Sequence, residues 1–229
     1  MLATANPDKA REICEIVTDV VGHPLAAYAL GVAADDRTVA FFVTVPDRLA
    51  GELAALPPLT TAPAVEETGA TLEANARIKA RGVCALTGVV AIADDTGLEV
   101  DALDGAPGVR AARYAGDRAT YAENVQKLLA ELERVGAADG GRAARFATVA
   151  MACWPDGREL AVRGEVEGRI AETPRGAGGF GYDPVFVPTE GDGRTFAEMS
   201  ADEKHELSHR GRAFRALAVA LDRAHEDEG

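Results

Sequence analysis

The feature that most constrains the fold is a continuous apolar run at residues 89–93, followed at once by two carboxylates, Asp94 and Asp95. A run of this length is typical of a strand in the middle of a sheet, with both faces covered. Two carboxylates at the end of a buried strand are costly unless they serve a purpose. Because ligand sites in α/β sheets lie at strand ends, the sequence predicts a polar site directly after residue 93.

Helical and strand patterns alternate on either side of this run. Apolar spacing, helix caps and capping boxes predict helices over residues 7–21, 71–86, 120–135 and 208–223. Strands are predicted at residues 1–5, 39–45, 145–153, 158–167 and 185–187, with a Pro-Asp-Gly turn joining two of them in a hairpin. The chain is therefore expected to form one α/β domain, residues 1–229, around a sheet of mixed strand order.

Charge and cysteine content narrow the function classes. A formal net charge of −13 disfavours nucleic acid polymers and acidic membranes as partners, but a local cluster of cations could still bind a small anion. No apolar run reaches the roughly 18 residues of a membrane span, and Asp8 and Lys9 interrupt the start, which argues against a signal peptide. The scattered Cys14, Cys84 and Cys153 are interpreted as reduced buried thiols, so a cytoplasmic location is expected.

Two short motifs suggest functions that their context disfavours. Residues 176–181 match the Gly-x-Gly-x-x-Gly dinucleotide pattern, but Pro184 follows where that pattern requires a helix. Residues 205–209 match the HExxH helix of zinc proteases, in which the two histidines share a helix face. Gly211 follows directly, and no third ligand has the usual spacing, so a zinc metallohydrolase is the less favoured alternative.

Two polar segments lie before the apolar run. Thr4-Ala5-Asn6-Pro7-Asp8-Lys9 opens a predicted helix, whose N-terminus suits a phosphate; alone, a helix cap and a solvated lysine explain it better. Glu66-Glu67-Thr68-Gly69 is followed by Asn75 and Lys79, which share a helix face. Alone, these are ordinary surface residues.

Two more polar segments lie after the run. Asp94-Asp95-Thr96-Gly97 offers the oxygen ligands that Mg²⁺ prefers, and an Asp beside metal-bound water can act as a general base; a turn or helix cap is the plain alternative. Phe180-Gly181-Tyr182-Asp183, Lys204 and Ser208-His209-Arg210 provide a ring that could stack on a base, with basic groups at a helix start. A packed aromatic and solvated cations would explain each of these alone.

Together these segments resemble the HAM1/RdgB family of inosine triphosphate pyrophosphatases. The most specific stretch is ADDTGLEVDALDGAPGVRAARYAG, residues 93–116, and GGFGYDPVF and EKHELSHR follow in the expected order. The resemblance runs from residue 2 to about residue 217, with residues 23–64 excepted. Ala5 departs from it, because the family usually has glycine there, and residues 23–64 are longer than expected.

The resemblance implies an elongated α/β fold around a long mixed sheet, with a substrate cleft between two lobes, in a homodimer. The implied reaction is Mg²⁺-dependent hydrolysis of noncanonical purine nucleoside triphosphates (ITP, dITP, XTP) to the monophosphate and pyrophosphate. The implied metal ligands are Glu67 and Asp95, and Asp95 is also the implied base. The implied substrate-binding residues are Thr4, Asn6, Lys9, Lys79, Thr96, Phe180, Gly181, Tyr182, Asp183, Lys204, His209 and Arg210. A non-catalytic purine nucleotide-binding protein is the second alternative; it would be expected to lose the acidic residues.

Overall fold

The computed structural model describes residues 2–4, 6–21, 26–29, 41–45 and 67–226. Ala5 and most of the expected 23–64 elaboration lie outside these residues; the described parts of that segment are strands β2 (Ala26–Ala29) and β3 (Phe41–Val45). The chain forms two compact units. Unit 1 contains Met1–Asp95, Val149–Val162 and Ala213–Gly229, and unit 2 contains Thr96–Thr148 and Arg163–Arg212.

Within the described residues, eight strands form one mixed sheet, which confirms the predicted α/β class. Its order is β2-β3-β1-β4-β6-β7-β8, with β5 pairing β4. The remaining strands are β1 (Leu2–Ala3), β4 (Ala91–Val100), β5 (Pro107–Gly108), β6 (Ala143–Cys153), β7 (Glu159–Ile170) and β8 (Phe186–Pro188). Strand β1 is parallel to β4 and antiparallel to β3, whereas β7 and β8 are antiparallel.

Strand β4 corrects the expected position of the carboxylates. The strand runs from Ala91 to Val100, so Asp94 and Asp95 lie inside it rather than after its end. The strand that ends here is the short β1, whose last pair joins Ala3 to Ala93. The polar residues therefore lie just beyond the last residue pair that β1 makes with β4, and Thr4 follows directly from β1.

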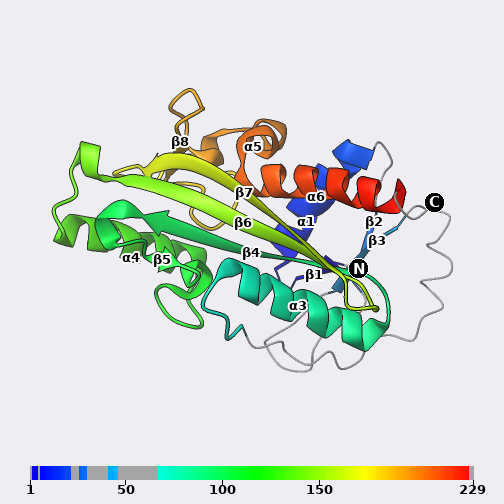
Figure 1. The fold of residues 1–229 in the computed structure, drawn as a ribbon. Helices are drawn as coiled ribbons and strands as arrows, with labels where there is room; N and C mark the ends of the chain where they lie inside the picture. Colours follow the sequence, from blue (N-terminus) through cyan, green and yellow to red (C-terminus); the bar gives the residue numbers. More distant parts are fainter. Residues whose placement is uncertain (1, 5, 22–25, 30–40, 46–66, 227–229) are drawn as a thin grey trace. The chain divides into compact units, whose positions relative to one another are not determined.

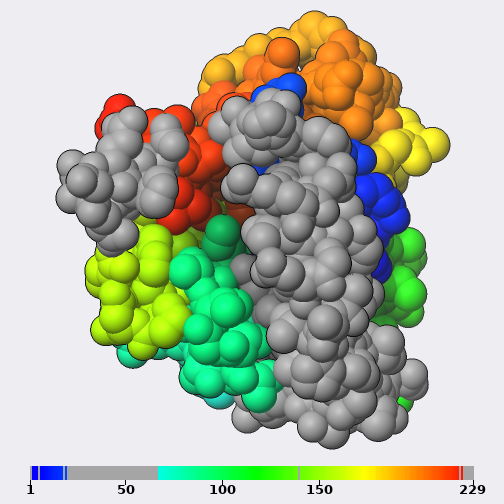
Figure 2. All heavy atoms as spheres, turned by 90° about the vertical axis from the view of Figure 1, so that its right-hand side faces the viewer, coloured from blue at the N-terminus to red at the C-terminus, as the bar shows by residue number. Residues whose placement is uncertain are grey.

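In unit 1, helices cover both faces of the strands (Figure 1). Helix α1 (Pro7–Val21) and the C-terminal helix α6 (His209–Glu226) share one core with β1 and β6, in which Ile13, Ile16 and Phe214 are buried. Helix α3 (Leu72–Thr87) lies on the opposite face, beside the tip of the β6–β7 hairpin (Figure 2), where Arg77 and Arg81 pair with Glu159.

The helix ends follow local chemistry that the sequence displays. At the start of α3, Thr71 Oγ1 accepts a hydrogen bond from the Ala74 N–H at 3.1 Å. At its end Gly88 has φ of 69°, a left-handed conformation that favours glycine. A capping box opens α4 (Tyr121–Arg134) at Thr120, as predicted, and another opens α5 (Ala201–Leu207) at Ser200. Within the described residues, no helix is both long and apolar enough to cross a membrane.

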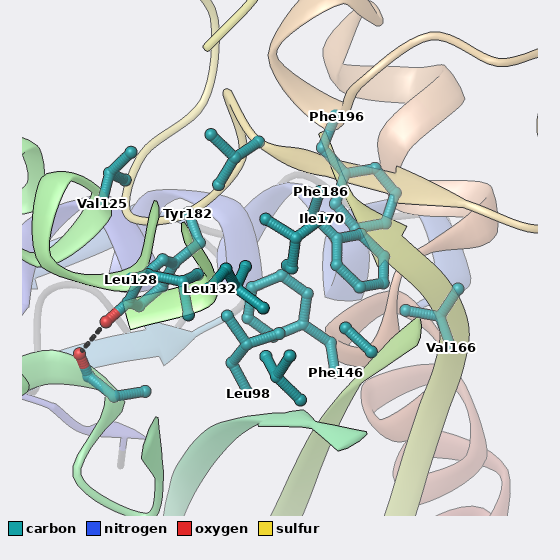
Figure 3. Close-up of a cluster of buried hydrophobic side chains, with 14 of the residues drawn as sticks. Leu98, Val125, Leu128, Leu132, Phe146, Val166, Ile170, Tyr182, Phe186 and Phe196 are labelled. Carbon is teal, nitrogen blue, oxygen red and sulfur yellow. Dashed lines mark hydrogen bonds between the residues drawn. The ribbon is translucent and has the colours of Figure 1, made fainter. Parts of the chain in front are cut away.

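The core of unit 2 is aromatic and aliphatic (Figure 3). Phe146 and Phe186 have ring centroids 4.7 Å apart, and Leu98, Leu128 and Ile170 are fully buried around them. Close packing of this kind fixes the strand positions from which the polar side chains of unit 2 project.

Candidate active site

The first polar group lies where β1 meets α1. Asn6 caps α1: its Oδ1 accepts hydrogen bonds from the N–H groups of Asp8 at 2.9 Å and Lys9 at 3.2 Å, and its own N–H donates to Thr4 Oγ1 at 3.2 Å. The capping interpretation of Asn6 is thus confirmed. Because its oxygen satisfies first-turn N–H groups, a phosphate contact from this side chain would have to use its Nδ2.

Lysines from two helices reach the carboxylates of β4. Lys9 Nζ of α1 lies 3.0 Å from Asp94 Oδ2, and Lys79 Nζ of α3 lies 3.0 Å from Asp95 Oδ1. Lys79 also lies 3.2 Å from Glu67 Oε1. Five side chains therefore meet in unit 1: Lys9, Glu67, Lys79, Asp94 and Asp95. The two predicted metal ligands, Glu67 and Asp95, both pair with the ammonium of Lys79.

Burial and charge act in opposite directions on this group. Burial lowers the pKa of Lys79, but the charges of Asp95, Glu67 and Asp94 outweigh it and hold that pKa above its usual value. Burial also raises the pKa of Asp95, and the charges of Lys79 and Lys9 offset this only in part. The site therefore contains a firmly cationic lysine beside a carboxylate of raised basicity, which suits a proton acceptor.

The second polar group surrounds the Phe180 ring in unit 2. Lys204 Nζ lies 4.8 Å from the ring centroid and the Arg210 guanidinium carbon 5.4 Å from it, within cation–π range. The buried Asp183 carboxylate accepts hydrogen bonds from Lys204 Nζ at 2.7 Å and from the Phe180 N–H at 2.8 Å. Asp183 thus shapes the loop that presents the ring.

A break between two helices brings both cations to this ring. Helix α5 ends at Leu207, Ser208 has an extended conformation (φ −70°, ψ 154°), and α6 begins at His209. In one continuous helix, residues six apart would lie about 120° apart around the axis. His205 and His209 therefore belong to different helices, which agrees with the interpretation of the HExxH match as a coincidence of sequence.

Two predicted contacts are buried in the core. The Tyr182 hydroxyl donates to the Ala111 carbonyl at 2.9 Å (Figure 3), so its side chain is not available as the expected substrate contact. The His209 ring stacks on Phe146, with centroids 4.4 Å apart and planes 9° apart. Gly181 has no side chain to offer a ligand; its φ of 64° is a left-handed backbone conformation that favours glycine in this loop.

Hydroxyl groups connect Arg210 to β4 and β6. Arg210 Nη2 donates to Thr96 Oγ1 at 3.1 Å, and Thr96 Oγ1 lies 2.7 Å from the Thr148 hydroxyl. Sequence reasoning missed Thr148, although a lone hydroxyl inside an apolar strand was a visible clue. It also left Asn75 out of the site, although Asn75 Nδ2 donates to Asp95 Oδ2 at 3.2 Å.

These features define the class: an α/β protein with buried lysine–carboxylate pairs in unit 1 and, in unit 2, two cations around an aromatic ring. The Ham1 family model matches residues 1–220, and the chain belongs to the Ham1 family. The prediction of the family is thereby confirmed.

Individual relatives agree with this membership. A dITP/XTP pyrophosphatase of Elusimicrobium minutum is 41% identical over 222 residues, covering 96% of this chain and 98% of that protein. A dITP/XTP pyrophosphatase of Bacillus licheniformis is 49% identical over 162 residues, 71% of this chain and 81% of its own length. The solved structure of a HAM1 protein from Coxiella burnetii has a TM-score of 0.72 at 36% identity, with 97% of each chain covered.

Proposed function

We propose that the chain hydrolyses noncanonical purine nucleoside triphosphates (ITP, dITP and XTP) to the monophosphate and pyrophosphate, with Mg²⁺ as cofactor. The observation that carries the proposal is the buried Asp95 carboxylate, which pairs with Lys79. Glu67 pairs with the same lysine. The names of the relatives, dITP/XTP pyrophosphatases, support the choice of substrate. A purely binding protein has no need of this acidic pair.

The acidic residues fit Mg²⁺ better than a dedicated zinc site. Glu67 and Asp95 direct oxygens at one cation, the Lys79 ammonium, and Mg²⁺ is commonly held by one or two carboxylates together with substrate phosphates. Among the described residues, no group of three or more His, Cys, Asp and Glu side chains is arranged to hold a metal. Glu67 and Asp95 would hold Mg²⁺, which would neutralise phosphate charge and polarise the attacked phosphorus.

In the proposed mechanism the lysines bind and orient the triphosphate. Lys9 and Lys79 come from different helices, and each already pairs with a carboxylate of β4, so the phosphates would lie beside Asp94 and Asp95. Asp95 would accept a proton from the attacking water, a role favoured by the burial that raises its pKa. The ammonium of Lys79 would hold phosphate charge as the leaving pyrophosphate departs.

The aromatic group would select the base. Phe180 is half-buried and could stack on a purine, while Lys204 and Arg210 are donor-only groups beside it. A 6-oxo purine offers them an acceptor, whereas the 6-amino group of adenine presents donor against donor. The contact accepts hypoxanthine and xanthine and disfavours adenine; because guanine also has the 6-oxo group, rejection of GTP needs another contact.

Product analysis tests the proposal. The protein is incubated with ITP and Mg²⁺, and the products are separated by ion-exchange chromatography. Inosine monophosphate with pyrophosphate is the expected result. Orthophosphate would reject the reaction, and bound but unchanged ITP would favour the non-catalytic alternative.

A homodimer and a cytoplasmic location complete the proposal. The three cysteines are free and buried, as a reducing compartment permits. Light scattering after size-exclusion chromatography should give twice the chain mass, and a monomer mass would reject the dimer.

A further inference from the structure

We propose that Asn75 is a positioning residue that fixes the Asp95 carboxylate relative to the segment carrying Glu67, and thereby sets the affinity of the site for a divalent cation. This inference rests on the proposed function. It assigns a role to a side chain that reaches neither the phosphates nor the base.

The contacts of Asn75 join the two carboxylate-bearing segments. Its side chain is fully buried on α3. Its Nδ2 donates to Asp95 Oδ2 at 3.2 Å, and its Oδ1 accepts from the Gly69 N–H at 2.8 Å. Gly69 lies two residues after Glu67, so one amide holds the backbone that carries Glu67 and the carboxylate of Asp95 together.

An amide is the side chain that can make this bridge without charge. It carries a donor and an acceptor on one planar group, and the two partners fix which end faces which. An aspartate here would place a second carboxylate against Asp95, and an alanine would leave both partners without this contact. The bridge is therefore specific to asparagine in chemistry and length.

Lys79 holds the other oxygen of the same carboxylate from one helical turn further along α3. A bound cation would compete with the Lys79 charge for Asp95 Oδ1, but the neutral Asn75 amide does not depend on that charge balance. Asn75 would thus keep the plane of the carboxylate fixed whether or not the site holds a metal.

Gly69 supplies a second observation for the bridge. A Cβ atom at residue 69 would lie 2.6 Å from Asn75 Oδ1 and 2.9 Å from the Asn75 backbone nitrogen. Both distances are shorter than real contacts, and the second involves helix backbone that cannot move cheaply. The close approach needed for the bridge therefore requires glycine.

The test compares Asn75→Ala with a matched control, Asn124→Ala. Asn124 is equally buried on another helix and also bridges loop backbone, donating to the Ala112 carbonyl at 3.0 Å and accepting from the Ala115 N–H at 2.8 Å. Binding of Mn²⁺ alone is measured by electron paramagnetic resonance, Mg²⁺ dependence by ITP turnover, and stability by thermal unfolding.

Asn75→Ala should weaken Mn²⁺ binding about 10–100-fold, as expected when a group that orients a metal ligand is removed. The Mg²⁺ concentration that gives half-maximal ITP turnover should rise by a similar factor. Asn124→Ala should lower the unfolding temperature similarly and leave Mn²⁺ affinity within about threefold of wild type. Wild-type Mn²⁺ affinity in Asn75→Ala, or equal losses in both variants, would overturn the inference.

Gly69→Ala approaches the same bridge from its other side and keeps the test decisive if Asn75→Ala does not fold: on its own it should also weaken Mn²⁺ binding, and wild-type Mn²⁺ affinity in Gly69→Ala would overturn the inference. Its loss of Mn²⁺ affinity should not add to that of Asn75→Ala in the double variant, because both break one link. Additive losses would contradict the bridge. A wild-type protein that neither binds Mn²⁺ nor releases pyrophosphate would instead overturn the proposed function.

Discussion

Removing the carboxylate of Asp183 should destabilise unit 2 far more than removing a surface carboxylate. The side chains of Asp183 and Lys204 are 5% and 7% exposed, and they lie 2.7 Å apart. Deleting one partner of a buried pair typically costs about 3–5 kcal/mol, since the remaining charge is poorly solvated. Loss of the bond from the Phe180 N–H adds about 1 kcal/mol.

Urea unfolding followed by circular dichroism measures the effect. With a slope of about 2–3 kcal/mol/M for a chain of this size, the combined loss of about 4–6 kcal/mol in Asp183→Ala should lower the midpoint by roughly 1.3–3 M. The matched control is Glu165→Ala, which removes the exposed partner of Arg163 and should cost less than about 1 kcal/mol.

A second substitution separates charge from packing. Asp183→Ala combined with Lys204→Met removes both charges and leaves an apolar chain against the rings of Phe180 and Phe196. The double variant should regain at least half of the lost stability. A single variant that costs no more than the Glu165 control, or a double variant less stable than the single one, would refute the reasoning.

Further predictions concern catalysis and reactivity. Asp95→Asn should lower ITP turnover by about 10²–10⁴-fold with the fold retained by circular dichroism, and near-normal turnover would remove Asp95 from the mechanism. Lys79→Ala should weaken binding of ITP far more than of inosine in calorimetry, and equal losses would show that Lys79 does not contact phosphate. Arg210→Ala should reduce turnover of ITP sharply and of ATP little, whereas an equal factor for both would deny it a base-reading role. Burial, and next the negative charge of Glu159, raises the pKa of the Cys153 thiol to about 11. The reactive thiolate form therefore disappears as the pH falls below that value. At pH 8 only about one thiol in a thousand is ionised, and iodoacetamide should label Cys153 in urea but not in the native protein; rapid native labelling would contradict the burial.

Much of the fold was predictable because its determinants are local. Thr71 and Gly88 bracket α3, and a capping box opens α4, because each needs only a few adjacent residues. The length of β4 was not predictable from Asp94-Asp95-Thr96-Gly97, since aspartate and glycine are poor strand formers. Pairing with neighbouring strands overrides that local preference, and those neighbours are distant in the sequence.

The candidate site divides in the same way. Asp95 could be selected because two carboxylates after a buried apolar run demand an explanation, whereas Lys9 and Lys79 were selected through the resemblance to the family. The partner of Thr148 and the bridging role of Asn75 could not be predicted, because the groups they contact lie 52 and 20 residues away in the sequence. A helix start near Ser208 was predicted from the sequence, and the structure adds that α5 ends just before it, with Ser208 extended between the two helices.

The break at Ser208 also restricts the insertions and deletions that relatives of this chain can tolerate. One extended residue joins two helices that each bring a cation to Phe180, so adding or deleting a residue between 204 and 210 would rotate one cation about 100° away from the ring. Exposed Glu206 can change in kind without this consequence. Relatives that keep this ring arrangement should therefore vary in residue type at exposed positions such as 206 while the length of the stretch stays constant.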